Sequence, residues 1–156
     1  MARSAQPAVA VPAVGTPYGT EMGTTHGSAG DLYYDPFDFE VDANAQAIFD
    51  FVAANDWIAN LAVKDETRSN TSVCLKIVDR DVLALDADGQ AAFAKGVVAL
   101  LEKEGVAFDI GHYRDAPSGL RIWAGATIET ADMKALMPWL TWAFETQKAT
   151  LAQAAA

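Results

Sequence analysis

The chain has 156 residues, of which 51% are hydrophobic and 21% are charged, a composition typical of one globular domain with a substantial core. Its 21 acidic side chains outnumber its 11 basic ones, which gives a formal net charge of −10. Nucleic acids and anionic membranes bind clustered Lys and Arg, so we expect neither as a partner. Small anionic ligands stay possible, because a few well-placed arginines can bind them locally.

Cysteine and histidine are too sparse for a disulfide scaffold or a metal site. Cys74 is the single cysteine and alternates with apolar residues, so we interpret it as a structural thiol. His26 and His112 have no metal-ligand spacing around them, so we predict no bound metal. The apolar residues 8–11 are too few for a signal peptide, and no run reaches the ~20 apolar residues of a membrane span. We therefore expect a cytoplasmic protein.

The beginning of the chain differs in composition from the rest. Residues 1–30 are rich in Ala, Pro, Gly, Thr and Ser and show no apolar period, which is typical of a disordered linker. The aromatic and acidic residues 33–39 follow, and they could pack against the domain or against a partner. We predict a disordered leader over 1–40, a folded domain over 41–150 and a frayed tail over 151–156.

Helical spacing begins at Asp42, whose carboxylate is suited to cap the free N–H groups of a first turn. The apolar residues of this predicted helix recur three or four positions apart, at Ala45, Ile48, Phe49 and Val52. Alternating polar and apolar residues over 71–78 predict a strand with one buried face. A further edge strand is expected within 57–63.

Two more helices follow from the apolar spacing. One covers 88–104 and ends at Gly105, since glycine readily adopts the left-handed backbone that terminates many helices. Its apolar stripe comprises Phe93, Val97, Leu100 and Leu101. The other starts after Thr130, a suitable N-cap, and its stripe comprises Met133, Met137, Leu140 and Phe144. Pro138 lies inside this pattern, so we expect a kink or a restart there.

Two short strands are predicted between these helices. They cover 106–110 and 120–124, and the polar loop 111–119 would join them into an antiparallel pair. On the second strand, Arg121 and Trp123 are expected to point away from the core. The whole order predicts an α+β domain in which helices cover one face of a small, mainly antiparallel sheet.

A resemblance to a known family rests on five segments in this order: RSNTSVCLK (68–76), LLEKEGV (100–106), YRDAPSGLRIW (113–123), GAT (125–127) and PWL (138–140). From about Val41 onward, the chain resembles the C-terminal small domain of bacterial phosphoserine aminotransferases of the alphaproteobacterial type. The resemblance implies a class V, pyridoxal-phosphate-dependent aminotransferase, whose members form homodimers. They transfer the amino group of glutamate to 3-phosphohydroxypyruvate, giving phosphoserine and 2-oxoglutarate in serine biosynthesis.

The resemblance also implies residues for substrate binding. The arginine that matches Arg121 holds the substrate α-carboxylate, and a basic residue that matches Arg114 helps to bind the distal phosphate or carboxylate. His112 is a further candidate, although the loop spacing here differs from that of the family. Without the resemblance, Arg121 would be a solvent-facing residue paired with an acid such as Asp115. Arg114 and His112 would then be ordinary surface residues.

The resemblance does not extend to the residues that hold the cofactor in the family. A Schiff-base lysine of the family pattern is not found among Lys64, Lys76, Lys95, Lys103, Lys134 and Lys148. We therefore expect no catalytic residue in this chain, and neither tight binding of pyridoxal phosphate nor transamination by the chain alone.

Three interpretations stay open at this stage. The chain could be a fragment or one half of a split aminotransferase, with a large-domain subunit as its partner. It could instead be a stand-alone module that binds an anionic amino or keto acid or another protein, or the product of a defunct gene. Separation from a large domain would expose an apolar face, so we also predict self-association.

Overall fold

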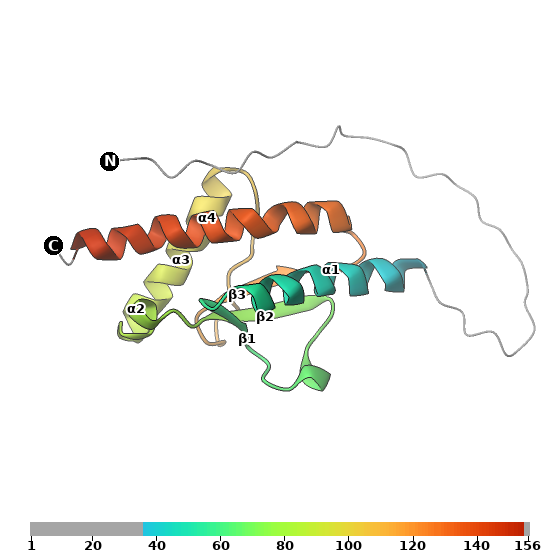
Figure 1. The fold of residues 1–156 in the computed structure, drawn as a ribbon, viewed down its shortest axis with the longest axis horizontal. Coiled ribbons are helices and arrows are strands. Elements are labelled where there is room, and N and C mark those ends of the chain that lie inside the picture. The colour runs from blue at the N-terminus through green and yellow to red at the C-terminus, as the bar shows by residue number, and fades with distance from the viewer. Residues whose placement is uncertain (1–35, 155–156) are drawn as a thin grey trace, which may run out of the picture.

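The computed structural model describes residues 36–154, in which a small sheet packs against helices (Figure 1). The helices are α1 (Pro36–Ala54), α2 (Arg80–Leu83), α3 (Ala87–Lys103) and α4 (Thr130–Ala154). The strands are β1 (Ile58–Asn60), β2 (Ser72–Ile77) and β3 (Leu120–Trp123), and a short 3-10 helix, η1 (Asp65–Thr67), lies between β1 and β2. The predicted α+β class, with an antiparallel sheet, is confirmed.

The sheet has the strand order β1-β2-β3. Buried and half-buried residues alternate along β2, which confirms the predicted strand with one buried face. In the register of β2 and β3, Val73 lies opposite Ile122 on the buried face. Cys74 lies opposite Arg121 on the other face. The expected edge strand within 57–63 is β1.

Residues 106–110 do not form the predicted strand. Phe108 is 71% exposed, whereas Ala107 and Ile110 are buried, so the side chains do not follow the expected alternation. The backbone is interrupted at Asp109, where φ is +53°, in the left-handed region that an extended strand does not visit. The segment is therefore a bent connection that runs past the edge of β3.

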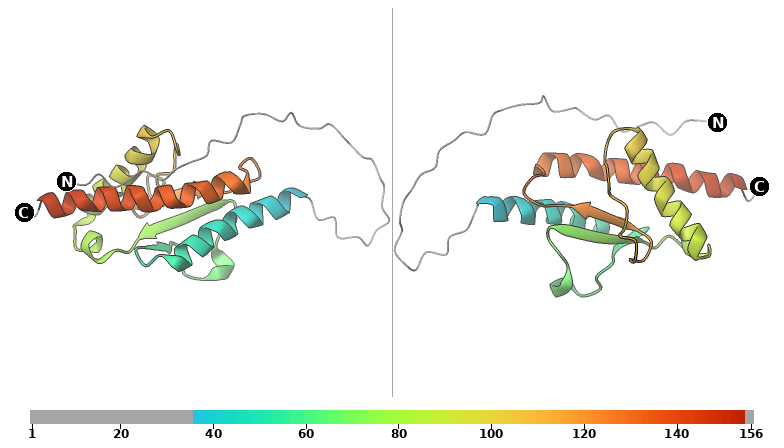
Figure 2. Two further views of the ribbon diagram at one scale, coloured as in Figure 1. Left: turned by 45° about the horizontal axis from the view of Figure 1, so that its top comes forward. Right: turned by 180° about the vertical axis from the view of Figure 1, so that it is seen from behind.

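The helices cover the buried face of the sheet. Figure 2 shows α1 and α4 side by side, while α3 crosses α4. The predicted stripe of α4 is confirmed, because all four of its residues are buried: Met133, Met137, Leu140 and Phe144. The rings of Phe144 and Trp57 stack with centroids 4.1 Å apart. The helix continues through Pro138, so the predicted restart does not occur.

The first helix starts earlier than predicted. The described part of the chain is already helical at Pro36, its first residue. Asp42 therefore lies inside α1 and is not its N-cap; its carboxylate accepts a hydrogen bond from Asn70 Nδ2 at 2.9 Å. Residues 36–40, which were expected to belong to the leader, are helical. The rest of the predicted leader lies outside the described residues.

The ends of α3 follow local capping chemistry. Asp86 is the N-cap, and its carboxylate accepts from the N–H of Gly89 at 2.8 Å, so the helix starts at Ala87, one residue earlier than predicted. Gly105 follows the helix with φ at +69°, which confirms the predicted stop. Over residues 36–154 no helix is long and apolar enough to cross a bilayer, and no group of three or more His, Cys, Asp or Glu side chains could hold a metal ion.

Candidate anion-binding site

The strand β3 holds Arg121 in a fixed position on the face of the sheet away from the core. Leu120 and Ile122 on either side of it are buried, so strand alternation directs the Arg121 side chain to the opposite face. Gly119 lets the strand begin tightly against β2, because a Cβ at that position would lie 2.0 Å from the carbonyl oxygen of Leu75. The backbone on both sides of Arg121 is thus constrained.

The side chain of Arg121 is largely buried, which differs from the solvent-facing arginine considered as the alternative to a substrate role. It is only 15% exposed. Nη2 donates to Oδ2 of Asp109 at 3.1 Å and to the main-chain oxygen of the same residue at 3.3 Å. The ring of Tyr113 stacks on the guanidinium with its centroid 4.5 Å from Cζ. The acid that pairs with Arg121 is therefore Asp109, and not Asp115, the example considered for an arginine without the substrate role.

One buried donor of this guanidinium is left without an acceptor. The Nε of Arg121 is buried and has no hydrogen-bond partner among the described residues. A buried donor without an acceptor is costly and calls for an explanation, such as a bound water or ion or a functional role. The arginine is thus held by its neighbours while part of its hydrogen-bonding capacity is unused.

Asp109 reaches Arg121 because of the way the preceding segment meets β3. The main-chain N–H of Arg121 donates to the carbonyl of Ile110 at 2.8 Å, and Gly111 forms a bridge with Leu120. This pairing places the residue before Ile110 beside the arginine. The carboxylate of Asp109 lies on the outside of the ion pair, since its side chain is 92% exposed.

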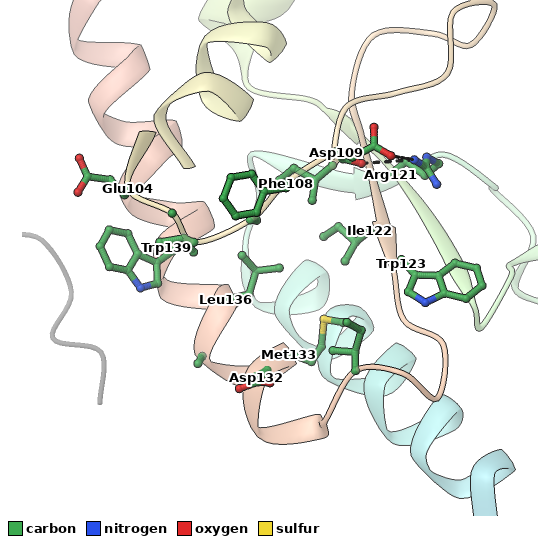
Figure 3. Close-up of a pocket in the computed structure, with 16 residues that line it drawn as sticks. Glu104, Phe108, Asp109, Arg121, Ile122, Trp123, Asp132, Met133, Leu136 and Trp139 are labelled. Carbon is green, nitrogen blue, oxygen red and sulfur yellow. Dashed lines mark hydrogen bonds and ion pairs between the residues drawn. The ribbon is translucent and has the colours of Figure 1, made fainter. Parts of the chain in front are cut away.

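A hollow of about 820 Å³ lies beside this ion pair. Figure 3 shows Arg121 and Asp109 at one rim, with side chains of α4 on the opposite wall. The walls are mainly apolar and include Phe108, Ile122, Met133, Leu136 and Trp139. The volume falls in the range of small-molecule sites.

The structure separates Arg121 from the two other predicted site residues. His112 and Arg114 line a second hollow, of about 490 Å³, beside α3. Arg114 is exposed and His112 is half-buried, and neither side chain has a hydrogen bond or ion pair within residues 36–154. No lysine lines the first hollow, and Lys95, which lines the second, is exposed on α3. A buried lysine suited to a Schiff base is absent from both walls.

Sequence reasoning missed two residues of the Arg121 site. Asp109 and Tyr113 contact the guanidinium, but neither was predicted to bind or to position it. A usable signal was present, because an antiparallel pair closed by the loop 111–119 brings the residues before the loop opposite those after it. The prediction of a regular strand over 106–110 did not use this signal, because it considered only which of its side chains face the core.

No protein-family model matches the chain. The phosphoserine aminotransferases of Methanosarcina mazei and Methanosarcina barkeri are each 48% identical to it over 103 residues, which is 65% of this chain and 25% of each relative. The chain thus spans about a quarter of the length of these curated relatives.

The fold is also found in a solved structure of a phosphoserine aminotransferase with radiation damage of the Schiff base. It matches with a TM-score of 0.54 and 15% identity, over 69% of this chain and 27% of that one. The alphaproteobacterial grouping stays a prediction. The matched region of this chain is similar to phosphoserine aminotransferases, as the ordered segments predicted.

Proposed function

We propose that this domain supplies the substrate-carboxylate half-site of a phosphoserine aminotransferase, and that Arg121 binds the carboxylate. The observation that carries the proposal is the state of Arg121, which lines a hollow. Its side chain is largely buried and stacked on Tyr113, and its buried Nε has no acceptor in the described part of the chain. The two substrates that the resemblance implies, glutamate and 3-phosphohydroxypyruvate, both carry a carboxylate beside the reacting carbon.

The chemistry of arginine suits this task. Its planar guanidinium can donate two parallel hydrogen bonds to one carboxylate, and such charge-assisted pairs are about twice as strong as neutral hydrogen bonds. Stacking on Tyr113 restricts the plane of the guanidinium, so less conformational freedom is lost when an anion binds. A restrained arginine orients its ligand better than a mobile surface lysine would.

Arg114 and His112 are proposed as contacts for the distal phosphate or carboxylate. Their side chains are without hydrogen bonds or ion pairs in the described part of the chain, so they are available to an anion. They line a different hollow from Arg121, which makes them secondary contacts. Their loss is expected to weaken the binding of phosphoserine more than that of glutamate, because only phosphoserine carries a dianionic phosphate.

The cofactor is proposed to bind outside the residues described here. Pyridoxal phosphate supplies the electron sink of an aminotransferase and needs a lysine in a sheltered pocket. The residues around the two hollows do not fit it, since the first has no lysine and Lys95 at the second is exposed. A large-domain subunit or a longer form of the chain would provide that part. An absorbance band near 400 nm that borohydride fixes onto the purified chain would contradict this.

Calorimetric titration of the chain with phosphoserine and with glutamate tests the main proposal. Arg121→Ala is expected to weaken both affinities by at least about tenfold, since hydrogen bonds to charged groups are worth about 1.5–3 kcal/mol. Arg80→Ala is the matched control, because Arg80 is 96% exposed and its only ion pair within residues 36–154 is a 3.6 Å contact with Asp81. Equal affinities of wild type and Arg121→Ala would overturn the proposal.

The alternative is a stand-alone anion-binding module. It is favoured by the fact that Arg121, Asp109 and Tyr113 form their contacts within this one chain. A large-domain reading frame beside the gene would favour the split enzyme. Tight phosphoserine binding by the chain, with no such neighbour, would favour the module.

A further inference from the structure

We infer that Asp109 is an internal competitor for the anion site: its carboxylate occupies the Arg121 guanidinium in the free chain, and a ligand carboxylate must displace it. This inference rests on the proposed function of Arg121. It identifies Asp109 as a residue that sets the affinity of the site. One of its two tests, described below, does not require a ligand to bind.

The first support is the asymmetry of the ion pair. Arg121 is 15% exposed, whereas the carboxylate of Asp109 is 92% exposed. A buried structural ion pair would remove both groups from water. Here the acid lies on the solvent side and makes a single 3.1 Å contact through Oδ2. Ion pairs with one partner so exposed hold weakly, so this carboxylate can be displaced.

The second support is that the guanidinium does not depend on the carboxylate for its position. Tyr113 stacks on it at 4.5 Å, and the main-chain oxygen of Asp109 accepts from Nη2 at 3.3 Å. Neither contact involves the Asp109 side chain. Nε is also unsatisfied in the free chain. A ligand carboxylate that bridges Nε and Nη2 would therefore make a contact that Asp109 does not make.

The third support is the backbone of Asp109. Its φ of +53° lies in the left-handed region, which aspartate and asparagine tolerate better than most residues do and which glycine adopts freely. The side chain is exposed, so aspartate is not required there for packing. The left-handed backbone directs the Asp109 carboxylate to Arg121. This unusual conformation is explained if the carboxylate serves to occupy the anion site in the free chain.

The geometry supplies well-matched variants. Asp109→Asn keeps the shape and the tolerance for positive φ while removing the charge, and Asp109→Gly removes the side chain without backbone strain. Asp115→Asn is the control, because Asp115 is an exposed acid of the same loop that makes no ion pair with Arg121. Asp115→Asn removes one negative charge, as Asp109→Asn does, so the two variants have the same net charge and the same general attraction for anions.

The first experiment is calorimetric titration of glutamate and phosphoserine at one fixed, low salt concentration. Asp109→Asn and Asp109→Gly are expected to bind about twofold to fivefold more tightly than wild type, the range expected for release of an exposed ion pair. Asp115→Asn should stay close to wild type. Unchanged or weaker binding by both Asp109 variants overturns the inference and leaves the proposed function of Arg121 standing.

The second experiment is independent of ligand binding. Phenylglyoxal modifies accessible guanidinium groups, and peptide mass spectrometry follows Arg121 with the exposed Arg80 as an internal reference. Asp109→Asn is expected to speed the modification of Arg121 relative to Arg80, and Asp115→Asn is not. Equal relative rates in wild type and Asp109→Asn would show that the carboxylate does not cover the site. A third outcome is faster modification of Arg121 in Asp109→Asn while no variant binds glutamate or phosphoserine. This outcome would support the pairing of Asp109 with Arg121 and contradict the proposed carboxylate half-site.

Discussion

Cys74 on β2 lies directly opposite Arg121 on β3, and both side chains are on the face of the sheet away from the core. Side chains opposite each other in an antiparallel pair have Cβ atoms about 4.5–5.5 Å apart. The thiol is free and half-buried, as the sequence predicted. It is therefore a natural reporter for the anion site.

Alkylation of Cys74 with N-ethylmaleimide is expected to weaken phosphoserine binding by about tenfold, because the added group would crowd the Arg121 guanidinium. Calorimetry of fully modified protein checks this, with the extent of reaction measured by mass spectrometry. Cys74→Ser treated in the same way should bind like untreated wild type. Complete modification with an unchanged dissociation constant would place the ligand elsewhere.

Gly119→Ala is expected to destabilise the chain by about 1–3 kcal/mol, because its Cβ would lie 2.0 Å from the Leu75 carbonyl and the start of β3 would have to move. Urea unfolding gives the free energy. Gly111→Ala, at the other end of the same loop, has nothing within 4 Å of its Cβ and should change stability little. Equal effects of the two substitutions would argue against the close contact of the strands.

Asn44 is fully buried in α1 and ties that helix to the chain after β3. Its Nδ2 donates to the carbonyl of Ala124 at 3.3 Å and to that of Ile128 at 2.7 Å. Asn44→Ala leaves two acceptors unsatisfied and is expected to cost about 1–3 kcal/mol of unfolding free energy in urea. Gln46→Ala, which loses an exposed hydrogen bond to Asp50, should cost far less. A smaller effect at Asn44 than at Gln46 would contradict this role.

Lys148 on α4 binds two acids near the N-terminus of α2, with Nζ 2.6 Å from Asp79 and 3.2 Å from Asp81. Burial acts to raise the pKa of Asp79, but the hydrogen bonds from Lys148 and from the N–H groups of Val82 and Asp81 outweigh it and lower the pKa below 3.8. The hydrogen bonds to Asp79 and Asp81 raise the pKa of Lys148 above 10.5.

These shifts predict the pH range over which the contact stabilises the fold. A carboxyl with a lowered pKa stabilises the folded state above 3.8, and this contribution is lost as the pH falls further. The lysine contribution is present below pH 10.5 and is lost as the pH rises through its raised pKa. Urea unfolding of wild type and Asp79→Asn should differ at pH 6 and converge toward pH 2.5. A constant difference across this range would contradict the shift.

Self-association is predicted for the purified chain, because Phe108 and Trp123 are exposed on the walls of the large, mainly apolar hollow. Sedimentation should show a mass that rises with concentration. Phe108→Ser should lower the association, whereas Val63→Ser, which removes an 81% exposed residue away from the hollow, should not. A clean monomer at high concentration would count against the prediction.

The apolar spacing of α3 and α4 and the alternation of β2 predicted these elements correctly, because each pattern depends on which side of a regular element meets the core. The ordered segments predicted the similarity to phosphoserine aminotransferases in the same way, since they are properties of the linear chain. The strand predicted over 106–110 was wrong. Short apolar runs can alternate by chance, and the sequence pattern does not reveal a bend in the backbone.

The partner of Arg121 could not be derived from the linear chain. Asp109 and Asp115 are both acids within reach of the arginine along the sequence, and composition does not distinguish them. The hydrogen bond from Arg121 to Ile110 and the left-handed backbone of Asp109 select one of the two. Spacing along the chain thus predicts elements and kinship, while the pairing of charges depends on strand register and local backbone geometry, which arise only when distant segments pack together.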